Sequence, residues 1–511
     1  MSRQPAGRLL GPGPALPATF DVAVVGAGVV GAGIARELAR YRLAVVLLEA
    51  GPDVGAGTSK ANTALLHTGF DAKPGTVEAR LVRRGHALLH EHGPRLGIPL
   101  EQPGALLVAW TDEQRRALPG IVERAHANGV TDVAPIGLAE LYRREPHLGP
   151  GATGALEVPG EGIVCPFTTP LAFATEAVVN GVRLCLDSPV TGTRSGPGGP
   201  HRLDTPAGTV RAWWVVNAAG LHADELHRRF GHADLTVTPR RGELIVFDKL
   251  ARPLLGHILL PVPTATTKGV LVAPTVFGNV LLGPTAEDLH DKHDTASTEA
   301  GVRGLLAKGR RILPALVGEE VTAVYAGLRA ATGQGDYCLA VHPGERYAVA
   351  GGIRSTGLSA SLAIAEQLVA DLGRAGLELR PKPVFQQVRM PNIGEAFPRP
   401  YRSAAAVAHN PDYGRIVCHC ERVTRGELLD AASGPIPARD LDGLRRRTRA
   451  LMGRCQGFYC TAEVAVLLAE ASGRTMAEIL GLPAARQPSG GPAPRPPRAG
   501  EHPTERAAAR R

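Results

Sequence analysis

Four of the chain's seven cysteines crowd one stretch near the C-terminus, where they could bind metal. They follow the pattern Cys418-x-Cys420, then thirty-four residues, then Cys455-x4-Cys460. Four thiolates suit either a zinc ion or a [2Fe-2S] cluster. Structural zinc sites usually contain C-x2–4-C pairs, so the tighter spacing of the first pair favours the [2Fe-2S] cluster. Zinc is the alternative.

A glycine-rich turn near the N-terminus has the spacing of a nucleotide-binding site. Gly26, Gly28 and Gly31 lie between an expected strand over residues 20–25 and an expected helix, and a second apolar run ends at Glu49. In such a turn the first glycine permits a tight bend, the second lets a pyrophosphate approach the backbone, and the third lets the helix pack on the strand. The glutamate can accept hydrogen bonds from both ribose hydroxyls. The pattern predicts a bound dinucleotide; a glycine-rich turn without a ligand is the alternative.

Two further strand-to-glycine segments are expected to lie along the same ligand. Residues 209–220 indicate a buried strand that ends in small residues, and residues 347–352 indicate another, followed by a helix over about residues 359–372. Between them, strand-like runs over residues 239–283, separated by turns, predict an antiparallel sheet. Three separate glycine-rich segments, each at the end of a strand, suit a long ligand better than a single mononucleotide.

Length and composition are typical of a globular, multidomain protein. A chain of 511 residues is long enough for about two or three domains with a large core. Hydrophobic residues make up 44% of it and charged residues 21%, as in globular proteins. The net charge of +9 does not indicate nucleic-acid binding, because residues 439–454 and 484–511 each contribute +4 and only 4% of residues are aromatic. Four arginines of the first cluster form either a solvated helix face or a docking face for an acidic partner. They are Arg445, Arg446, Arg447 and Arg449.

The sequence gives no sign of membrane insertion or export. No apolar run reaches the roughly 18 residues that a membrane-spanning helix needs. Residues 1–19 are rich in proline and glycine and lack the basic start and long apolar core of a signal peptide. We therefore expect a disordered leader and a cytoplasmic protein.

Several motifs resemble a known flavoprotein family. GAGVVG…E, TSKANTALLHTGFDAKPGT, VVNAAG, PRRGELIVFD and YAVAGGIRSTG, all within residues 20–372, resemble the FAD-dependent glycerol-3-phosphate dehydrogenase/oxidase branch of the D-amino-acid-oxidase superfamily. The segment IVCHCERVTRGEL…LRRRTRALMGRCQGFYC resembles the bacterioferritin-associated-ferredoxin type of [2Fe-2S] domain. The large subunit of anaerobic glycerol-3-phosphate dehydrogenase has the same two-part arrangement.

The resemblance implies a fold and a division into domains. The implied fold class is α/β: a Rossmann-like FAD-binding domain of the glutathione-reductase-2 type, an α+β substrate domain on a mainly antiparallel sheet, and a small helical [2Fe-2S] domain. The expected parts are a disordered leader (1–19), a discontinuous FAD-dependent oxidoreductase domain (20–375), a proline-rich linker (376–410), a [2Fe-2S]-binding domain (411–483) and a disordered basic tail (484–511).

The resemblance also implies FAD and a [2Fe-2S] cluster as cofactors, with the four cysteines as cluster ligands. Ser59 and Asn62 would line the pyrophosphate and the flavin, and residues 352–357 would contact the ribityl chain and the ring. The full set of expected FAD-binding residues is Gly26, Gly28, Gly31, Glu49, Ser59, Asn62, Thr63, Ala219, Gly220, Gly352, Ser355, Thr356 and Gly357.

The candidate catalytic residues are a histidine and three cations. Oxidation of a secondary alcohol needs a base for the hydroxyl proton, and histidine side chains in general titrate near neutrality. His67 is the candidate, because it is in the position of a histidine near the flavin in the oxidase branch. A hydrogen-bonded structural histidine is the alternative. Arg329, Lys268 and Arg354 would bind an anionic substrate, with Arg329 favoured because a guanidinium clamps phosphate or carboxylate through two parallel hydrogen bonds. An exposed loop arginine is the alternative for Arg329.

The expected activity is oxidation of glycerol 3-phosphate or a similar 2-hydroxy anion. Electrons would leave through the cluster to an acceptor protein or quinone. Peripheral membrane association through a partner is compatible with this role. Where aerobic relatives carry a GGK motif, this chain has Gly351-Gly352-Ile353-Arg354, and residues 61–75 look closer to the oxidase branch. The alternatives are a 2-hydroxyglutarate-like or amino-acid oxidoreductase and, in a different class, a non-catalytic electron-transfer or docking protein.

Overall fold

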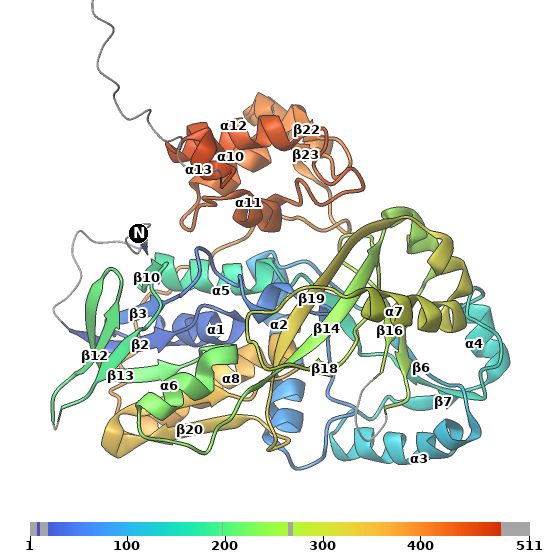
Figure 1. Cartoon of the computed structure of the whole chain (residues 1–511), viewed down its shortest axis with the longest axis horizontal. Coiled ribbons are helices and arrows are strands. Elements are labelled where there is room, and N and C mark those ends of the chain that lie inside the picture. The colour runs from blue at the N-terminus through green and yellow to red at the C-terminus, as the bar shows by residue number, and fades with distance from the viewer. Residues whose placement is uncertain (1–7, 11–18, 197, 264–268, 482–511) are drawn as a thin grey trace, which may run out of the picture.

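A computed structural model describes residues 8–10, 19–196, 198–263 and 269–481 (Figure 1). Lys268, the basic tail over 484–511 and most of the expected leader lie outside these residues. Figure 1 shows a body with a parallel sheet in one half and an antiparallel sheet in the other, and a C-terminal module stacked on that body.

A parallel sheet forms the centre of the first half. Its five parallel strands follow the order β10-β3-β2-β13-β21, and antiparallel strands extend both edges. The parallel strands are β2 (Phe20–Val25), β3 (Val45–Leu48), β10 (Arg183–Leu186), β13 (Gly208–Asn217) and β21 (Tyr347–Gly351). The antiparallel ones are β1 (Arg8–Leu10), β11 (Gly192–Arg194), β12 (His201–Thr205) and β20 (Cys338–His342). Buried, β-branched runs such as VVLL in β3 explain why these segments form central strands.

Helices cover both faces of this sheet. On one face α1 (Val29–Leu38) packs between α5 (Thr168–Val179) and α8 (Gly357–Arg374), and α2 (Val77–Leu96) packs on α8. On the other face lies α6 (Ala223–Arg229). The helices approach closely: a Cβ atom on Gly85 of α2 would lie 2.2 Å from the carbonyl oxygen of Ser359 in α8. The small residue at this position therefore allows the short distance between α2 and α8.

The second half is built on a mainly antiparallel sheet. Its strand order is β18-β14-β17-β16-β15-β6-β8-β7, with β19 paired to β14, and only β15 and β6 run parallel. The strands are β6 (Ala105–Ala109), β7 (Ala134–Ile136), β8 (Gly154–Val158), β14 (Thr238–Phe247), β15 (Ile258–Pro261), β16 (Leu271–Pro274), β17 (Val280–Gly283), β18 (Glu287–Asp288) and β19 (Val321–Ala331). Helices α3 (Asp112–Ala127), α4 (Leu138–Arg144) and α7 (Glu299–Ile312) pack against it.

A small three-stranded sheet joins the two halves. It consists of β4 (Leu65–Leu66), β5 (Leu100–Glu101) and β9 (Gly162–Val164), with β9 in the middle. The register pairs Leu66 with Gly162, so the residue after β4 lies opposite the residue before β9.

The C-terminal module has a hydrophobic core of its own, formed by residues such as Leu428, Leu444, Val464 and Leu468. A hairpin of β22 (Ile416–Cys418) and β23 (Val423–Thr424) precedes the helices α10 (Arg425–Ser433), α11 (Leu441–Thr448), α12 (Thr461–Ser472) and α13 (Met476–Ile479). In Figure 1 α11 lies on the side of the module that faces the body.

The structure confirms the expected fold class and changes two details of the expected division. Residues Arg8–Leu10, inside the segment expected to be a disordered leader, form strand β1 and pair with β10. The proline-rich segment 376–410 is irregular but packs along the body: Met390 N–H donates to Leu96 O, and Glu395 N–H donates to Val276 O. Its last part forms helix α9 (Ala404–His409). Within the described residues, no helix is long and apolar enough to cross a membrane.

Candidate functional site

The turn between β2 and α1 has the geometry that its three glycines predict. Gly26 has φ of +103°, and a Cβ atom there would lie 2.4 Å from the carbonyl oxygen of Ala218. A Cβ atom on Gly31 would lie 1.8 Å from the carbonyl oxygen of Gly26, so only glycine lets α1 pack on this turn. A Cβ atom on Gly28 would meet only the hydroxyl of Ser59. Gly28 therefore leaves its side of the turn open to a ligand.

Polar side chains already surround the start of α1. The Ser59 hydroxyl accepts a hydrogen bond from the Val29 N–H at 2.9 Å, at the helix N-terminus where an anion is favoured. The Glu49 carboxylate accepts from the Ala27 N–H at 2.6 Å and from the Gly51 N–H at 2.8 Å. These bonds fix the carboxylate beside the turn, and its remaining lone pairs can accept from ribose hydroxyls. The residues at this turn thus fit the adenosine diphosphate part of FAD.

A cavity of about 390 Å³ begins at this turn and runs between the two halves of the body. Most of the expected FAD-binding residues line it: Gly28, Ser59, Asn62, Thr63, Gly220, Gly352, Ser355 and Gly357. Gly26, Gly31, Glu49, Ala219 and Thr356 do not line it. Gly26 and Gly31 shape the turn, Glu49 binds its backbone, and Thr356 is buried, with its hydroxyl donating to Glu78 Oε1 at 2.7 Å. The roles of the individual residues toward FAD stay predictions.

His67 lies in this cavity directly after β4, with its side chain 15% exposed. Its Nδ1 is 3.0 Å from Oε2 of Glu161, a glutamate with no solvent exposure. Its backbone N–H donates to the Ser359 hydroxyl at 2.8 Å. In the described part of the chain, Nε2 of His67 has no hydrogen-bond partner. The expected base therefore presents one ring nitrogen to the cavity that no other described group occupies.

Arg329, on β19, is a second residue that lines the cavity. Its Nη2 donates to the Thr285 carbonyl at 2.7 Å, and within the described residues it makes no ion pair with a carboxylate. Burial, together with the nearby charge of Arg240, lowers the pKa of Arg329 to about 10, so it remains cationic near neutral pH. A half-buried guanidinium with no carboxylate at ion-pair distance in the described chain attracts an anionic ligand.

Arg354 also lines the cavity, but its charge is compensated. Its Nη2 lies 3.0 Å from Oε2 of Glu78 and donates to the Gly335 carbonyl at 2.9 Å. Lys268 lies outside the described residues. Of the three cations expected to bind substrate, Arg329 is the one whose environment supports that role most directly.

The four cysteines of the C-terminal module come together in two pairs. The sulfur atoms of Cys420 and Cys455 are 3.1 Å apart, and the Cys460 thiol hydrogen-bonds to Cys418. That bond, aided by the N–H groups of Glu421 and Leu451, lowers the pKa of Cys418 to about 6. Two pairs of thiols, with backbone N–H groups directed at sulfur, fit the two iron ions of a [2Fe-2S] cluster.

The backbone of the cysteine loops adopts unusual conformations. Of the seven non-glycine residues with positive φ in the described chain, four lie in these loops: Arg422, Arg449, Leu451 and Gln456. Such residues cost free energy and cluster at functional sites, where surrounding contacts hold them. Arg449 is the left-handed C-cap of α11, and the other three residues bend the loops that carry the cysteines.

The module docks on the body through buried ion pairs. Asp53, in the loop after β3, is 3% exposed and contacts Arg446 and Arg447 of α11 at 2.7 and 2.6 Å. Lys60, one residue beyond Ser59, lies 3.1 Å from Asp442. The expectation that the arginine cluster forms a solvated face or binds an external acidic partner is thus wrong for Arg446 and Arg447, which pair within the chain.

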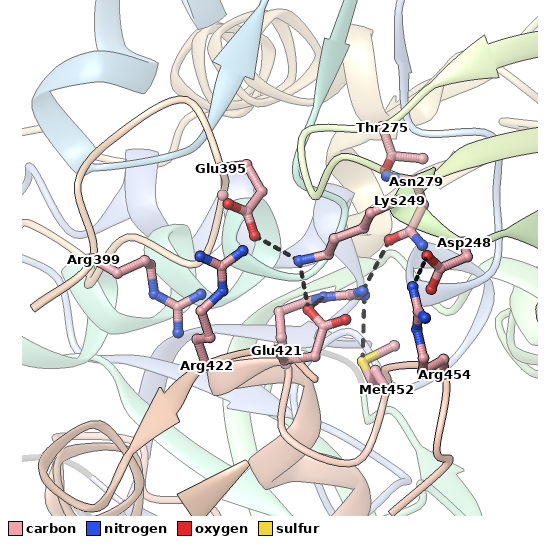
Figure 2. Close-up of polar contacts among 12 residues, drawn as sticks. Asp248, Lys249, Thr275, Asn279, Glu395, Arg399, Glu421, Arg422, Met452 and Arg454 are labelled. Atoms are coloured by element: carbon pink, nitrogen blue, oxygen red, sulfur yellow. Dashed lines mark hydrogen bonds and ion pairs between the residues drawn. The ribbon is translucent and has the colours of Figure 1, made fainter. Parts of the chain in front are cut away.

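Figure 2 shows a second set of contacts between the module and the body, made by residues next to the cysteines in the sequence. Lys249 lies 3.1 Å from Glu421, the residue that follows Cys420, and Arg454, which precedes Cys455, lies 2.6 Å from Asp248. Arg449 donates to the Asn279 side chain at 3.1 Å, and its guanidinium lies 4.2 Å from the centre of the Phe277 ring. Arg449 therefore also binds within the chain, and both cysteine loops are anchored to the body.

The dinucleotide turn opens into a cavity lined by His67 and Arg329, and a thiol-rich module is docked beside it. This arrangement is that of a redox flavoprotein with an attached iron–sulfur domain. Residues 21–372 match the FAD dependent oxidoreductase (DAO) family, and residues 416–470 match the BFD-like [2Fe-2S] binding domain. The chain belongs to the FAD dependent oxidoreductase family, with FAD and a [2Fe-2S] cluster as its cofactors.

Individual relatives agree with this assignment. The chain is 35% identical over 463 residues to a glycerol 3-phosphate dehydrogenase of Caloramator mitchellensis, covering 90% of this chain and 96% of the relative. It is 31% identical over 360 residues to a glycerol 3-phosphate oxidase of Mycoplasma pneumoniae, covering 69% of this chain and 94% of the relative. The structure of the L-alpha-glycerophosphate oxidase of Mycoplasma pneumoniae with FAD bound superposes with a TM-score of 0.69 at 29% identity, covering 73% of this chain and 98% of that one. The alternative of a non-catalytic protein is wrong, because the chain is an FAD-dependent oxidoreductase.

Several residues of the site were not expected from the sequence. Glu161 and Glu78 are buried carboxylates that bind His67 and Arg354, and Asp53 anchors the module. Glu161 lies 94 residues from His67, and Asp53 lies 393 residues from Arg446. No local motif marks such residues, because only strand pairing and domain docking bring them to their partners.

Proposed function

We propose that this enzyme oxidises glycerol 3-phosphate at C2 and passes the electrons through the cysteine module to a separate acceptor. The observation that carries the proposal is the pairing of functions in one cavity: His67 offers a free ring nitrogen, and Arg329 offers a half-buried charge. An alcohol that carries a phosphate needs both groups. The similarity to glycerol 3-phosphate dehydrogenases supports this choice of substrate.

In the proposed reaction each residue of the site has a separate role. Arg329 binds the phosphate through its guanidinium and so fixes the substrate in the cavity. His67 accepts the hydroxyl proton at Nε2 as the alcohol becomes a ketone. Bound FAD supplies the acceptor for the hydride equivalent that leaves carbon. Glu49, Ser59 and the glycine turn hold the cofactor, and the two halves of the body enclose the reacting groups.

Electrons are proposed to leave through the exposed part of the loop between Cys455 and Cys460. The α11 side is closed by the ion pairs of Asp53. Between Cys455 and Cys460, Phe458 is 83% exposed and Tyr459 is 76% exposed, with their ring centres 5.2 Å apart. Exposed aromatic residues at a redox site suit docking of an acceptor protein, or contact with a quinone, better than they suit solvent. Cysteines without disulfide bonds and an iron–sulfur domain support a cytoplasmic location for the protein.

Anaerobic flavin reduction tests the substrate. The oxidised holoenzyme is mixed in a stopped-flow instrument with glycerol 3-phosphate, L-2-hydroxyglutarate or an amino acid, and loss of the visible flavin band is followed. We expect saturable bleaching with glycerol 3-phosphate, and His67→Ala should slow it by about 10²–10⁴-fold. Because Arg329 can clamp a carboxylate as well as a phosphate, faster bleaching by L-2-hydroxyglutarate would assign the site to 2-hydroxy acids instead.

A further inference from the structure

Strand pairing places a buried glutamate against the proposed base. His67 follows β4 and Glu161 precedes β9, and the register of these antiparallel strands pairs Leu66 with Gly162. The two side chains therefore meet across the end of the ladder although they are 94 residues apart. Gly160 makes room for this contact, because a Cβ atom there would lie 2.8 Å from Cγ2 of Thr68.

The hydrogen bonds of Glu161 determine how its two oxygens are used. Oε1 accepts from the Thr68 backbone N–H at 2.7 Å and from the Thr68 hydroxyl at 2.8 Å. Oε2 lies 3.0 Å from Nδ1 of His67. With Glu161 ionised, both of its oxygens only accept hydrogen bonds, and Nδ1 of His67 is then the donor. A neutral imidazole carries one N–H group, and Nε2 is therefore left with its lone pair.

We propose that Glu161 is a positioning residue that holds His67 in the Nδ1–H tautomer and stabilises the imidazolium formed during the reaction. When the substrate O–H bond breaks, the proton forms the new N–H bond at Nε2, while Nδ1–H remains bonded to Glu161. The ring then carries a positive charge beside a buried negative one. The catalytic part of this inference rests on the proposed function; the assignment of the tautomer does not.

The chain contains a matched pair that lacks the proposed role. Glu145 also has no solvent exposure, its Oε1 lies 2.7 Å from Nδ1 of His257, and it accepts from the backbone N–H groups of Gly256 and His257. Neither Glu145 nor His257 lines the cavity. Substitutions at Glu145 therefore report what the loss of a buried carboxylate–histidine pair does to stability alone.

Glutamine at position 161 should reverse the tautomer without changing the shape of the site. The Thr68 N–H can only donate, so the amide oxygen must take the place of Oε1. The amide NH2 group then faces Nδ1 of His67 and donates to it. Nδ1 becomes the acceptor, the ring proton moves to Nε2, and the nitrogen that should accept the substrate proton is already protonated.

The experiment compares Glu161→Gln with Glu145→Gln in the FAD-loaded full chain. Nitrogen NMR of protein with isotope-labelled histidine, with the His67 signal identified by its loss in His67→Gln, reports the tautomer without substrate. We expect Nδ1 to be protonated in the parent and in Glu145→Gln, and Nε2 to be protonated in Glu161→Gln. Flavin reduction at saturating glycerol 3-phosphate should fall by about 10²–10⁴-fold in Glu161→Gln only, with little change in the half-saturating concentration.

An Nε2-protonated His67 in the parent would overturn the inference. A Glu161→Gln enzyme that keeps FAD and reduces it at the parental rate would also overturn it. If no substrate bleaches the parent enzyme, the proposed function fails, and the NMR measurement still decides whether Glu161 sets the tautomer. Equal rate losses in Glu161→Gln and Glu145→Gln would show that both glutamates act through stability alone.

Discussion

Replacing Asp53 by asparagine should separate the cysteine module from the flavin domain without affecting substrate oxidation. Asp53 is 3% exposed, and its oxygens accept hydrogen bonds from Arg446 at 2.7 Å and from Arg447 at 2.6 and 2.7 Å. Burial opposes ionisation, but the charges and hydrogen bonds of both arginines lower the pKa of Asp53 below 3.8 overall. Asp53→Asn would leave two buried guanidinium groups without this carboxylate.

The contacts that survive the substitution set the size of the effect. Removing one partner of a buried ion pair typically costs about 3–5 kcal/mol. Arg446 retains Asp442, and Arg447 retains the carbonyl groups of Ile436 and Gly443. We therefore expect the lower end of that range, about 3 kcal/mol, which corresponds to a loss of about 10²-fold in the docking equilibrium at about 1.4 kcal/mol per tenfold.

Two measurements test this expectation. Hydrogen exchange should become faster in α11 and in the loop that contains Asp53, and steady-state electron transfer to an acceptor should fall while anaerobic flavin bleaching keeps its rate. Asp204→Asn on β12, which removes an exposed ion pair with Arg194 of β11, is the control and should change neither. Unchanged exchange in α11 together with full electron transfer in Asp53→Asn would refute the reasoning that this pair holds the module in place.

The remaining predictions concern the cofactors, the substrate anion and pH. Gly28→Leu should abolish retention of FAD, measured as flavin released on denaturation, because the side chain would occupy the open side of the turn. Joint replacement of Cys455 and Cys460 by serine should remove the iron signal and the steady-state transfer, while substrate still bleaches the flavin in a single turnover. Arg329→Ala should raise the half-saturating concentration of glycerol 3-phosphate by about 10²-fold or more, measured in the same stopped-flow assay, because it removes a half-buried charged hydrogen-bonding group. Docking lowers the pKa of Asp53 from 3.8, so Asp53 stabilises the docked module fully above that pH. This stabilisation is lost as the pH falls through the lower pKa of the docked state. Fluorescence of a label on α11 should therefore show an acid transition below pH 3.8 that Asp53→Asn lacks.

The parts of the site that could be predicted from sequence are those built from adjacent residues. The turn at Gly26 and Gly31 requires glycine for contacts within a few residues and with one neighbouring strand, and the spacing of the four cysteines reflects two short loops. Contacts between neighbouring residues determine the conformation of such local motifs, so the order of residue types alone indicates the chemistry.

The parts that could not be predicted depend on pairings between distant segments. Glu161 has no motif around it and gains its role only because β9 pairs with β4. The arginines in and after α11 have the composition of a surface cluster, and only docking of the module shows that Arg446 and Arg449 are buried and that the side chain of Arg447 is 6% exposed. Charge along a sequence reports which ion pairs are available, but it does not report which side of a helix another domain will cover.

The burial of these arginines bears on how the module works. A buried ion pair is weak evidence for stability, because desolvation offsets most of the attraction, but it fixes orientation where an apolar contact would allow the surfaces to slide. Arg447 contacts both oxygens of Asp53, and Arg449 and Arg454 bind Asn279 and Asp248 beside the cysteine loops. Contacts at two separated places define one position of the cysteines relative to the cavity. In the electron route that we propose, the module therefore keeps one orientation on the body, and we expect an acceptor to dock at the exposed residues Phe458 and Tyr459.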